Sequence, residues 1–114
     1  MARLPEETTL TINSLKQQLL DIVDDATAVE FALFERFGET SRTIPVLEQL
    51  KSVAEETASW FSQLSTLQLR IAQAQPIASA DMLELLAQVI ERTQLRLPAW
   101  KRSIQEVEID WNIP

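Results

Sequence analysis

The sequence predicts an all-α fold: an antiparallel up-down-up bundle of three long helices, forming a single domain over residues 1–114. Apolar residues recur at steps of three or four along three stretches of the chain, a spacing that follows one face of a helix and not the alternation of a strand. Gly38 is the only glycine in 114 residues, whereas sheets need more turn residues than that. Matched helix lengths and short connections favour antiparallel packing of neighbouring helices.

The first helix is predicted over about residues 9–37. Its apolar seam, the set of residues expected to face the core, comprises Ile12, Leu15, Leu19, Ile22, Ala26, Val29, Leu33 and Phe37. Gly38 follows this seam directly, and glycine often ends a helix because it reaches left-handed backbone angles without strain. The segment from Gly38 to Pro45 then supplies a loop.

The second helix is predicted over about residues 45–74. Its seam comprises Val46, Leu50, Val53, Thr57, Trp60, Leu64, Leu67 and Ile71. Pro45 suits the first turn of a helix, where its missing N–H has no partner to lose, and Thr43 is a candidate N-cap. Trp60 lies near the middle of this seam, so we expect its indole to be buried between the other two helices.

The third helix is predicted over about residues 80–110, after a break at Pro76. Its seam comprises Met82, Leu86, Val89, Thr93, Leu97, Trp100, Ile104, Val107 and Trp111. Ser79 is the expected N-cap, ahead of the acidic Asp81 in the first turn. Thr57 and Thr93 are expected to donate their hydroxyls to the carbonyl four residues earlier, as buried helical threonines commonly do.

Pro98 lies inside the third stretch and leaves two interpretations open. A proline in a helix interior removes one backbone hydrogen bond and clashes with the preceding turn, at a cost of about 3 kcal/mol if nothing compensates. The helix could bend and continue, or it could stop and restart as the last member of a four-helix bundle. Leu97 and Ala99 beside the proline are neither stop nor cap residues, and the seam continues through it. We therefore favour one helix kinked at Pro98.

Composition limits the classes of function. The sequence has no cysteine, which excludes disulfides and thiol nucleophiles and fits a reducing cytoplasm. The net charge of −7 opposes binding to nucleic acid, whose phosphates attract Lys and Arg. No apolar run reaches the roughly 18 residues of a membrane span, and the first residues lack the apolar core of a signal peptide. We expect a soluble, acidic, cytoplasmic protein that binds neither membrane nor nucleic acid.

Few residues in this sequence can carry catalysis. Without histidine there is no common general base, no common metal ligand and no catalytic triad. The remaining candidates are carboxylates, and they leave open a small all-α magnesium-dependent nucleotide hydrolase or a ligand-binding bundle. The seams place Asp24, Glu55 and Glu84 on the outward sides of three different helices, where they cannot converge on one ion. We therefore assign no catalytic, cofactor-binding or metal-binding residue and lean towards a protein that is not an enzyme.

The end of the first helix breaks its own apolar pattern. Phe31 and Phe34 fall outside the seam, one turn apart, at positions that should face water. A single exposed apolar residue is common on protein surfaces, but a pair of phenylalanines is not. A parallel third helix brings Ile109, also outside its seam, and Trp111 to the same end of the bundle. We predict that Phe31, Phe34, Ile109 and Trp111 form a partner-binding surface at this aromatic end.

Two explanations of this surface remain open. The last residues of the chain, 108–114, could fold over the two phenylalanines and cover them within one chain. Otherwise the surface binds a second copy of the chain or a helix of another protein, because Phe and Trp are residue types that anchor such contacts. An apolar small-molecule ligand is a further occupant that the pattern leaves open. The function predicted from the sequence is a non-enzymatic protein–protein interaction or assembly module, self-associating as a homodimer through its aromatic end.

Overall fold

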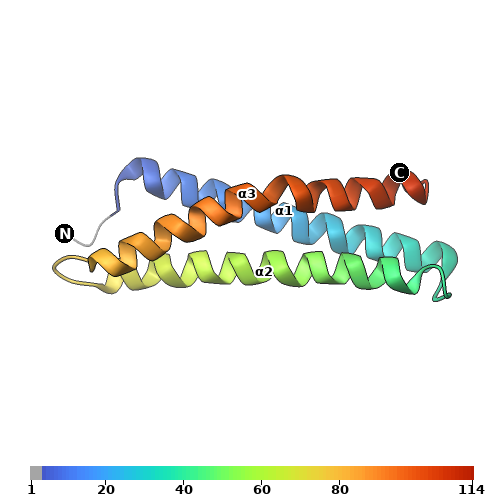
Figure 1. Cartoon of the computed structure of the whole chain (residues 1–114), viewed down its shortest axis with the longest axis horizontal. Helices are drawn as coiled ribbons and strands as arrows, with labels where there is room; N and C mark the ends of the chain where they lie inside the picture. Colours follow the sequence, from blue (N-terminus) through green and yellow to red (C-terminus); the bar gives the residue numbers. More distant parts are fainter. Residues whose placement is uncertain (1–3) are drawn as a thin grey trace.

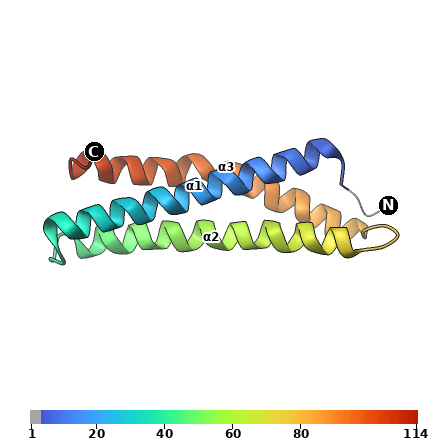
Figure 2. The ribbon, with the colours of Figure 1, turned by 180° about the vertical axis from the view of Figure 1, so that it is seen from behind.

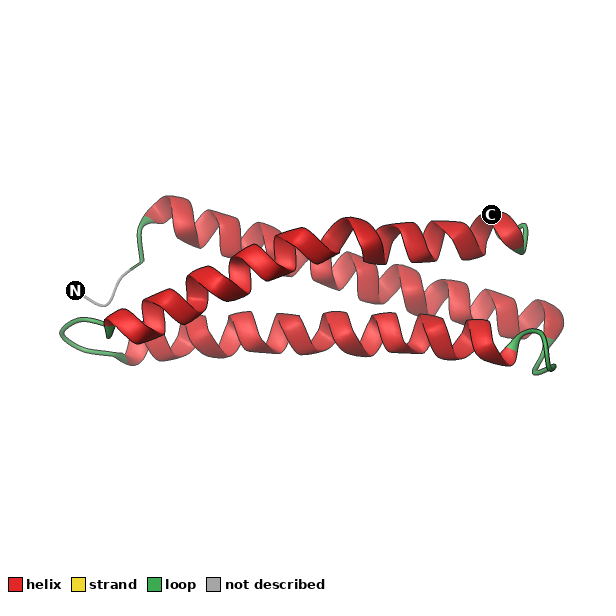
Figure 3. Ribbon diagram, viewed as in Figure 1, coloured by secondary structure: helices red, strands yellow, loops and turns green. Residues whose placement is uncertain are grey.

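Three helices account for most of the chain. The computed structural model describes residues 4–114 and contains α1 (Glu6–Phe37), α2 (Ile44–Gln73) and α3 (Ala80–Asp110), with no strand in that part of the chain. α1 and α3 run in the same direction and α2 runs antiparallel to both, in a rod of 56 × 20 × 17 Å (Figures 1 and 3). The predicted three-helix bundle is confirmed, and each helix begins and ends within three residues of the expected position.

One core runs along the bundle where the three seams meet. Three ranges form this core: positions 12–33 of α1, 50–71 of α2 and 86–107 of α3. Within these ranges, every predicted seam residue except Trp60 is buried. The hydroxyls of Thr57 and Thr93 donate to the carbonyls of Val53 and Val89, at 2.8 and 2.7 Å, as predicted. These bonds satisfy the two hydroxyls inside an otherwise apolar core.

Five predicted seam residues are not fully buried: Phe37, Val46, Trp60, Met82 and Trp111. Four of them lie at an end of the bundle, where no further helical turn covers them. Trp60 lies in the middle of α2, and the expectation that its indole is buried is wrong, because it packs against the core but stays partly exposed. Tryptophan is so large that it is rarely enclosed completely.

Trp100 on α3 is the tryptophan that the core encloses, with an exposed fraction of 3%. It lies two residues after Pro98, at a point where α3 continues as one helix from Ala80 to Asp110. The alternative of a fourth helix that starts at Pro98 is therefore wrong. Figures 1 and 2 both show α3 changing direction near its middle, as expected of a helix that lacks one backbone hydrogen bond there.

Local sequence explains where the helices begin and end. Gly38 adopts a φ of 66° after the last residue of α1, which is the left-handed region that favours glycine. Ser79 accepts a hydrogen bond from the N–H of Met82, as predicted for an N-cap. Thr43 differs from the expected cap: its buried hydroxyl donates to the carbonyl of Gly38 and accepts from the N–H of Thr40, so it fixes the loop and not the helix.

We expect Trp100→Ala to destabilise the fold more than Trp60→Ala. The first change leaves a cavity in the core and should lower the free energy of unfolding by about 3–5 kcal/mol. The second removes a side chain that already meets water and should cost about half as much or less. Urea denaturation followed by circular dichroism measures both losses. Equal losses, or a larger one for Trp60→Ala, would show that the register of α2 or α3 is wrong.

Candidate functional site

Phe31 and Phe34 lie near the carboxyl end of α1, at the end of the rod that also holds residue 114 (Figure 1). Their exposed fractions are 65% and 49%. Both line a groove of about 460 Å³ between α1 and α2, which we call the aromatic groove. Its other lining residues are Thr27, Glu30, Glu39, Leu47, Glu48 and Lys51.

Helix geometry explains why both rings face outward. Successive residues of an α-helix are turned by about 100°, so Phe31 lies about 200° round the axis from Val29, and Phe34 about 100° from Leu33. Val29 and Leu33 are buried against the other helices. The two phenylalanines are thereby left on the flank next to α2, where they line the aromatic groove.

The aromatic groove has an acidic rim. Glu30, Glu39 and Glu48 line it together with a single cation, Lys51. Charges placed in this way attract a basic surface and repel an acidic one over distances of about 8 Å at physiological salt. Any partner that reaches the two rings therefore meets a net negative field.

The end of the chain folds back onto the core. Asn112 adopts a φ of 53°, in a left-handed region that asparagine tolerates better than most residues. The N–H of Ile113 donates to the carbonyl of Glu108 at 2.8 Å, and the N–H of Asn112 donates to that of Ile109 at 3.2 Å. These two bonds close a Schellman motif at the end of α3. The turn buries Ile113 against the core, with an exposed fraction of 8%.

Trp111 packs on Phe37 and leaves the aromatic groove open. The centres of the two rings lie 5.2 Å apart at an interplanar angle of 61°, an edge-to-face geometry that aromatic pairs favour. Arg36 holds the chain end in place by donating a hydrogen bond of 2.7 Å to the carbonyl of Asn112. The chain end thus rests on the last turn of α1.

The four predicted partner-binding residues occupy two neighbouring places. Phe31 and Phe34 line the aromatic groove, whereas Ile109 and Trp111 do not. Ile109 is 76% exposed on α3, and Trp111 meets α1 through Phe37. Phe37 lies about one turn beyond Phe34 and carries the contact with Trp111, although the sequence pattern assigned it to the core.

The acidic residues considered as magnesium ligands are spread over the surface. Asp24, Glu55 and Glu84 are exposed on three different helices. The neighbouring Glu56, another acidic residue of α2, forms an ion pair with Arg96 on α3. Within residues 4–114, no group of three or more acidic side chains is placed so that it could hold a metal ion.

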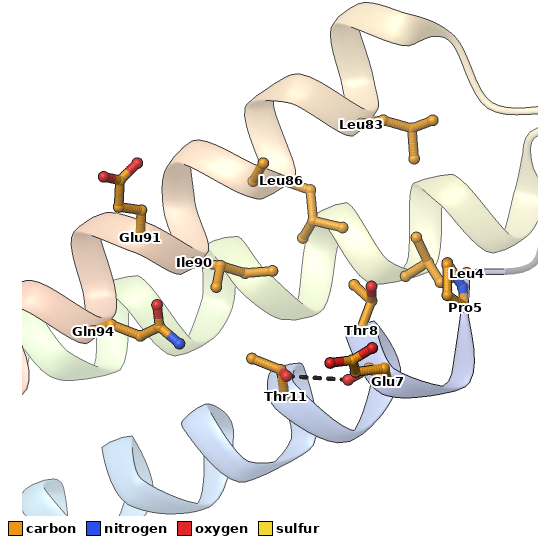
Figure 4. A pocket seen from close by; sticks show the side chains of 11 residues that line it. Leu4, Pro5, Glu7, Thr8, Thr11, Leu83, Leu86, Ile90, Glu91 and Gln94 are labelled. Atoms are coloured by element: carbon orange, nitrogen blue, oxygen red, sulfur yellow. Dashed lines mark hydrogen bonds between the residues drawn. The ribbon is translucent and has the colours of Figure 1, made fainter.

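A second groove lies at the opposite end of the rod, between the amino-terminal halves of α1 and α3, and we call it the amino-terminal groove. It encloses about 470 Å³. Figure 4 shows Leu83, Leu86 and Ile90 of α3 on one side of it, facing Thr8 and Thr11 of α1 on the other. The sequence-based prediction did not include this groove.

We expect the triple variant Asp24→Asn, Glu55→Gln, Glu84→Gln to have nearly the same free energy of unfolding as the wild type. Isolated surface charges contribute about 0–1 kcal/mol each, and removing three negative charges relieves some repulsion in a chain of net charge −7. Thermal denaturation with and without magnesium checks this expectation. A melting temperature that magnesium raises in the wild type, and no longer raises in the variant, would show that these carboxylates do bind the ion.

None of the helices within the described residues is long and apolar enough to cross a membrane. Comparisons with protein-family models, with curated proteins and with solved structures found no match to this chain. The function is therefore inferred from the surface of the molecule itself.

Proposed function

We propose that this chain is a non-enzymatic interaction module that self-associates as a homodimer through its aromatic end, in a reducing cytoplasm that suits a sequence without cysteine. The position of Phe31 and Phe34 carries this proposal. The core does not use the two rings, the chain end packs elsewhere, and both line an open groove. Covering them is favourable by about 25 cal/mol for each Å² of apolar surface removed from water.

A second copy of the chain is the partner that fits this pair. Phe31 and Phe34 lie one turn apart on the same helix. A twofold axis that passes between them therefore places Phe31 of one copy against Phe34 of the other. The four rings then form one cluster, in which offset or edge-to-face contacts add about 0.5–1.5 kcal/mol per pair to the area buried.

The two rings alone are too small for a stable dimer. Exposed fractions of 65% and 49% amount to little more than one whole phenylalanine side chain, on the order of 200 Å² per chain. A specific interface buries about 1,000 Å² or more in total. Leu47 of the groove and the Phe37–Trp111 pair are the apolar neighbours that would extend the contact, and Ile109 adds to it from α3. The proposed dimer therefore covers the whole aromatic end.

The acidic rim determines how such a dimer responds to salt. A twofold contact brings Glu30, Glu39 and Glu48 of one chain near the same residues of the other, with one Lys51 per chain to offset them. Added salt screens this repulsion, because the Debye length falls from about 10 Å at 0.1 M to about 3 Å at 1 M. Self-association should therefore strengthen as ionic strength rises, whereas binding of a basic partner should weaken.

Phe31→Glu combined with Phe34→Glu should abolish self-association and leave the fold intact. Both positions are exposed and helical, and glutamate is a good helix former. The free energy of unfolding should therefore change by less than about 1 kcal/mol. Sedimentation equilibrium at several protein concentrations, at low and high salt, measures the mass. The wild-type mass should rise towards that of two chains, and the variant should stay at that of one.

Leu69→Glu combined with Leu95→Glu is the matched control. It adds the same negative charge at positions that are 59% and 72% exposed and lie outside the aromatic end. This control should dimerise as the wild type does. The proposal is wrong if the wild type stays monomeric under every condition, or if the control loses the dimer to the same extent. Unfolding of the Phe31 and Phe34 variant would also overturn it, because the rings would then belong to the core.

A further inference from the structure

The amino-terminal groove continues along α1 for about three turns. Its hollow of about 470 Å³ adjoins another of about 400 Å³, and Glu7, Thr11 and Gln94 line both. The α1 residues of the two hollows run from Glu7 to Gln18, a length of about 17 Å at about 1.5 Å per residue. Figures 1 and 2 show α1 and α3 crossing near the middle of the rod and diverging from there, so that their amino-terminal ends lie apart.

Side-chain size explains why only one end of the α1–α3 contact is filled. At the aromatic end, the rings of Phe37 and Trp111 bridge from α1 to the end of α3. At the other end, α1 faces α3 with the short side chains of Thr8 and Thr11 (Figure 4). The two threonines leave the space between the helices open.

Most of the lining of the amino-terminal groove is apolar. α3 supplies Leu83, Leu86 and Ile90, and Figure 4 shows Leu86 and Ile90 directed towards the space between the helices. Leu4 and Pro5, just before α1, add apolar side chains from the opposite side, beside the threonines of α1. A segment that fits this lining has one apolar face and leaves its other sides to water, which describes an amphipathic helix lying in a groove.

The charged groups of the groove are negative. Glu7 and Glu91 are among the described residues that line it, and no Lys or Arg is. Lys or Arg side chains of a partner would donate hydrogen bonds to these two carboxylates. The net charge of −7 attracts a basic partner over a longer range.

These features identify the occupant of the groove. A second copy of the chain does not supply such a helix, because its three helices already turn their apolar seams into their own core. A small apolar molecule would stay largely exposed in a groove that is open along its side, whereas small-molecule sites bury most of the ligand. We propose that the amino-terminal groove binds an amphipathic helix of another protein, with an apolar face and Lys or Arg at its edges, completing a four-helix bundle.

Ala87→Arg tests this site. Ala87 is exposed and lines the groove, so an arginine there fills it and places a positive charge where the partner carries its own. The probe is a labelled synthetic helix of about 16 residues with leucine at i, i+4, i+7 and i+11, which span the length of the groove, and with lysine beside them. Fluorescence anisotropy should show saturable binding to the wild type that weakens with salt and weakens about tenfold or more in Ala87→Arg.

Ala58→Arg is the matched control, since Ala58 is an exposed residue within α2 that lines neither hollow of the groove. It should bind the lysine probe as the wild type does. A second probe, with glutamate in place of lysine and the same leucines, should bind about tenfold more weakly or worse. Circular dichroism verifies that each variant keeps its helicity.

Three outcomes would overturn this inference. The lysine probe could fail to bind the wild type, it could bind Ala87→Arg as tightly as the wild type, or the two probes could bind alike. A fourth outcome concerns the occupant. If Ala87→Arg abolishes self-association and the Phe31→Glu, Phe34→Glu variant does not, a second copy occupies the amino-terminal groove, and both this inference and the proposed dimer are wrong.

Discussion

The burial of three apolar seams against one another is the interaction on which the rest of the structure depends. In a three-helix bundle each helix turns one stripe towards the core, and positions 12–33, 50–71 and 86–107 provide those stripes. A large apolar residue outside them meets either water or a partner. Phe31 and Phe34 at one end of the rod, and Leu83 at the other, are in this position. The core thereby determines which residues are free to bind another protein.

The two grooves have different causes. The aromatic groove exists because large side chains stand outside a seam, and because the Schellman turn at Asn112 directs Ile113 into the core and Trp111 onto Phe37. The amino-terminal groove exists because α1 and α3 diverge and Thr8 is too short to fill the gap. If both grooves bind as proposed, this rod of 56 Å joins proteins at its two ends. A dimer through the aromatic end would leave both amino-terminal grooves free.

Periodicity and end signals in the sequence predict the helices and most of the core, because long helices are determined by local spacing and by residues such as Gly38 and Ser79. Spacing does not report how much room a position has. Trp60 has seam spacing but only partial burial, and Phe37 lies at a seam position beyond which no turn of helix covers it. The chain end carried a readable signal that the sequence-based prediction overlooked: Asn112 followed by an apolar residue and a proline is typical of a Schellman ending.

The candidate surfaces were predictable in part. The exposure of Phe31 and Phe34 follows from their angle to the seam, whereas their pairing with Leu47 depends on how α2 approaches α1. Leu83 and Ile90 form a second apolar stripe beside the α3 seam, and this stripe can be found in the sequence. The groove that it lines cannot be found in this way, since it arises from the divergence of two helices that are distant in sequence.

The central claim is that Phe31 and Phe34 face water in the single chain and face a second copy in the dimer. The solvent exposure of the phenylalanine rings, measured at low and high protein concentration, tests this claim most directly. The sequence has four phenylalanines, so fluorine-labelled phenylalanine gives one NMR signal for each ring, and a soluble paramagnetic agent broadens the signals of rings that water reaches. We expect Phe31 and Phe34 to be strongly broadened in dilute protein and protected in concentrated protein at high salt. Phe61, which lies under the ammonium group of Lys16, should not change. Protection of Phe31 and Phe34 at the lowest concentration, or equal broadening at every concentration, would contradict this.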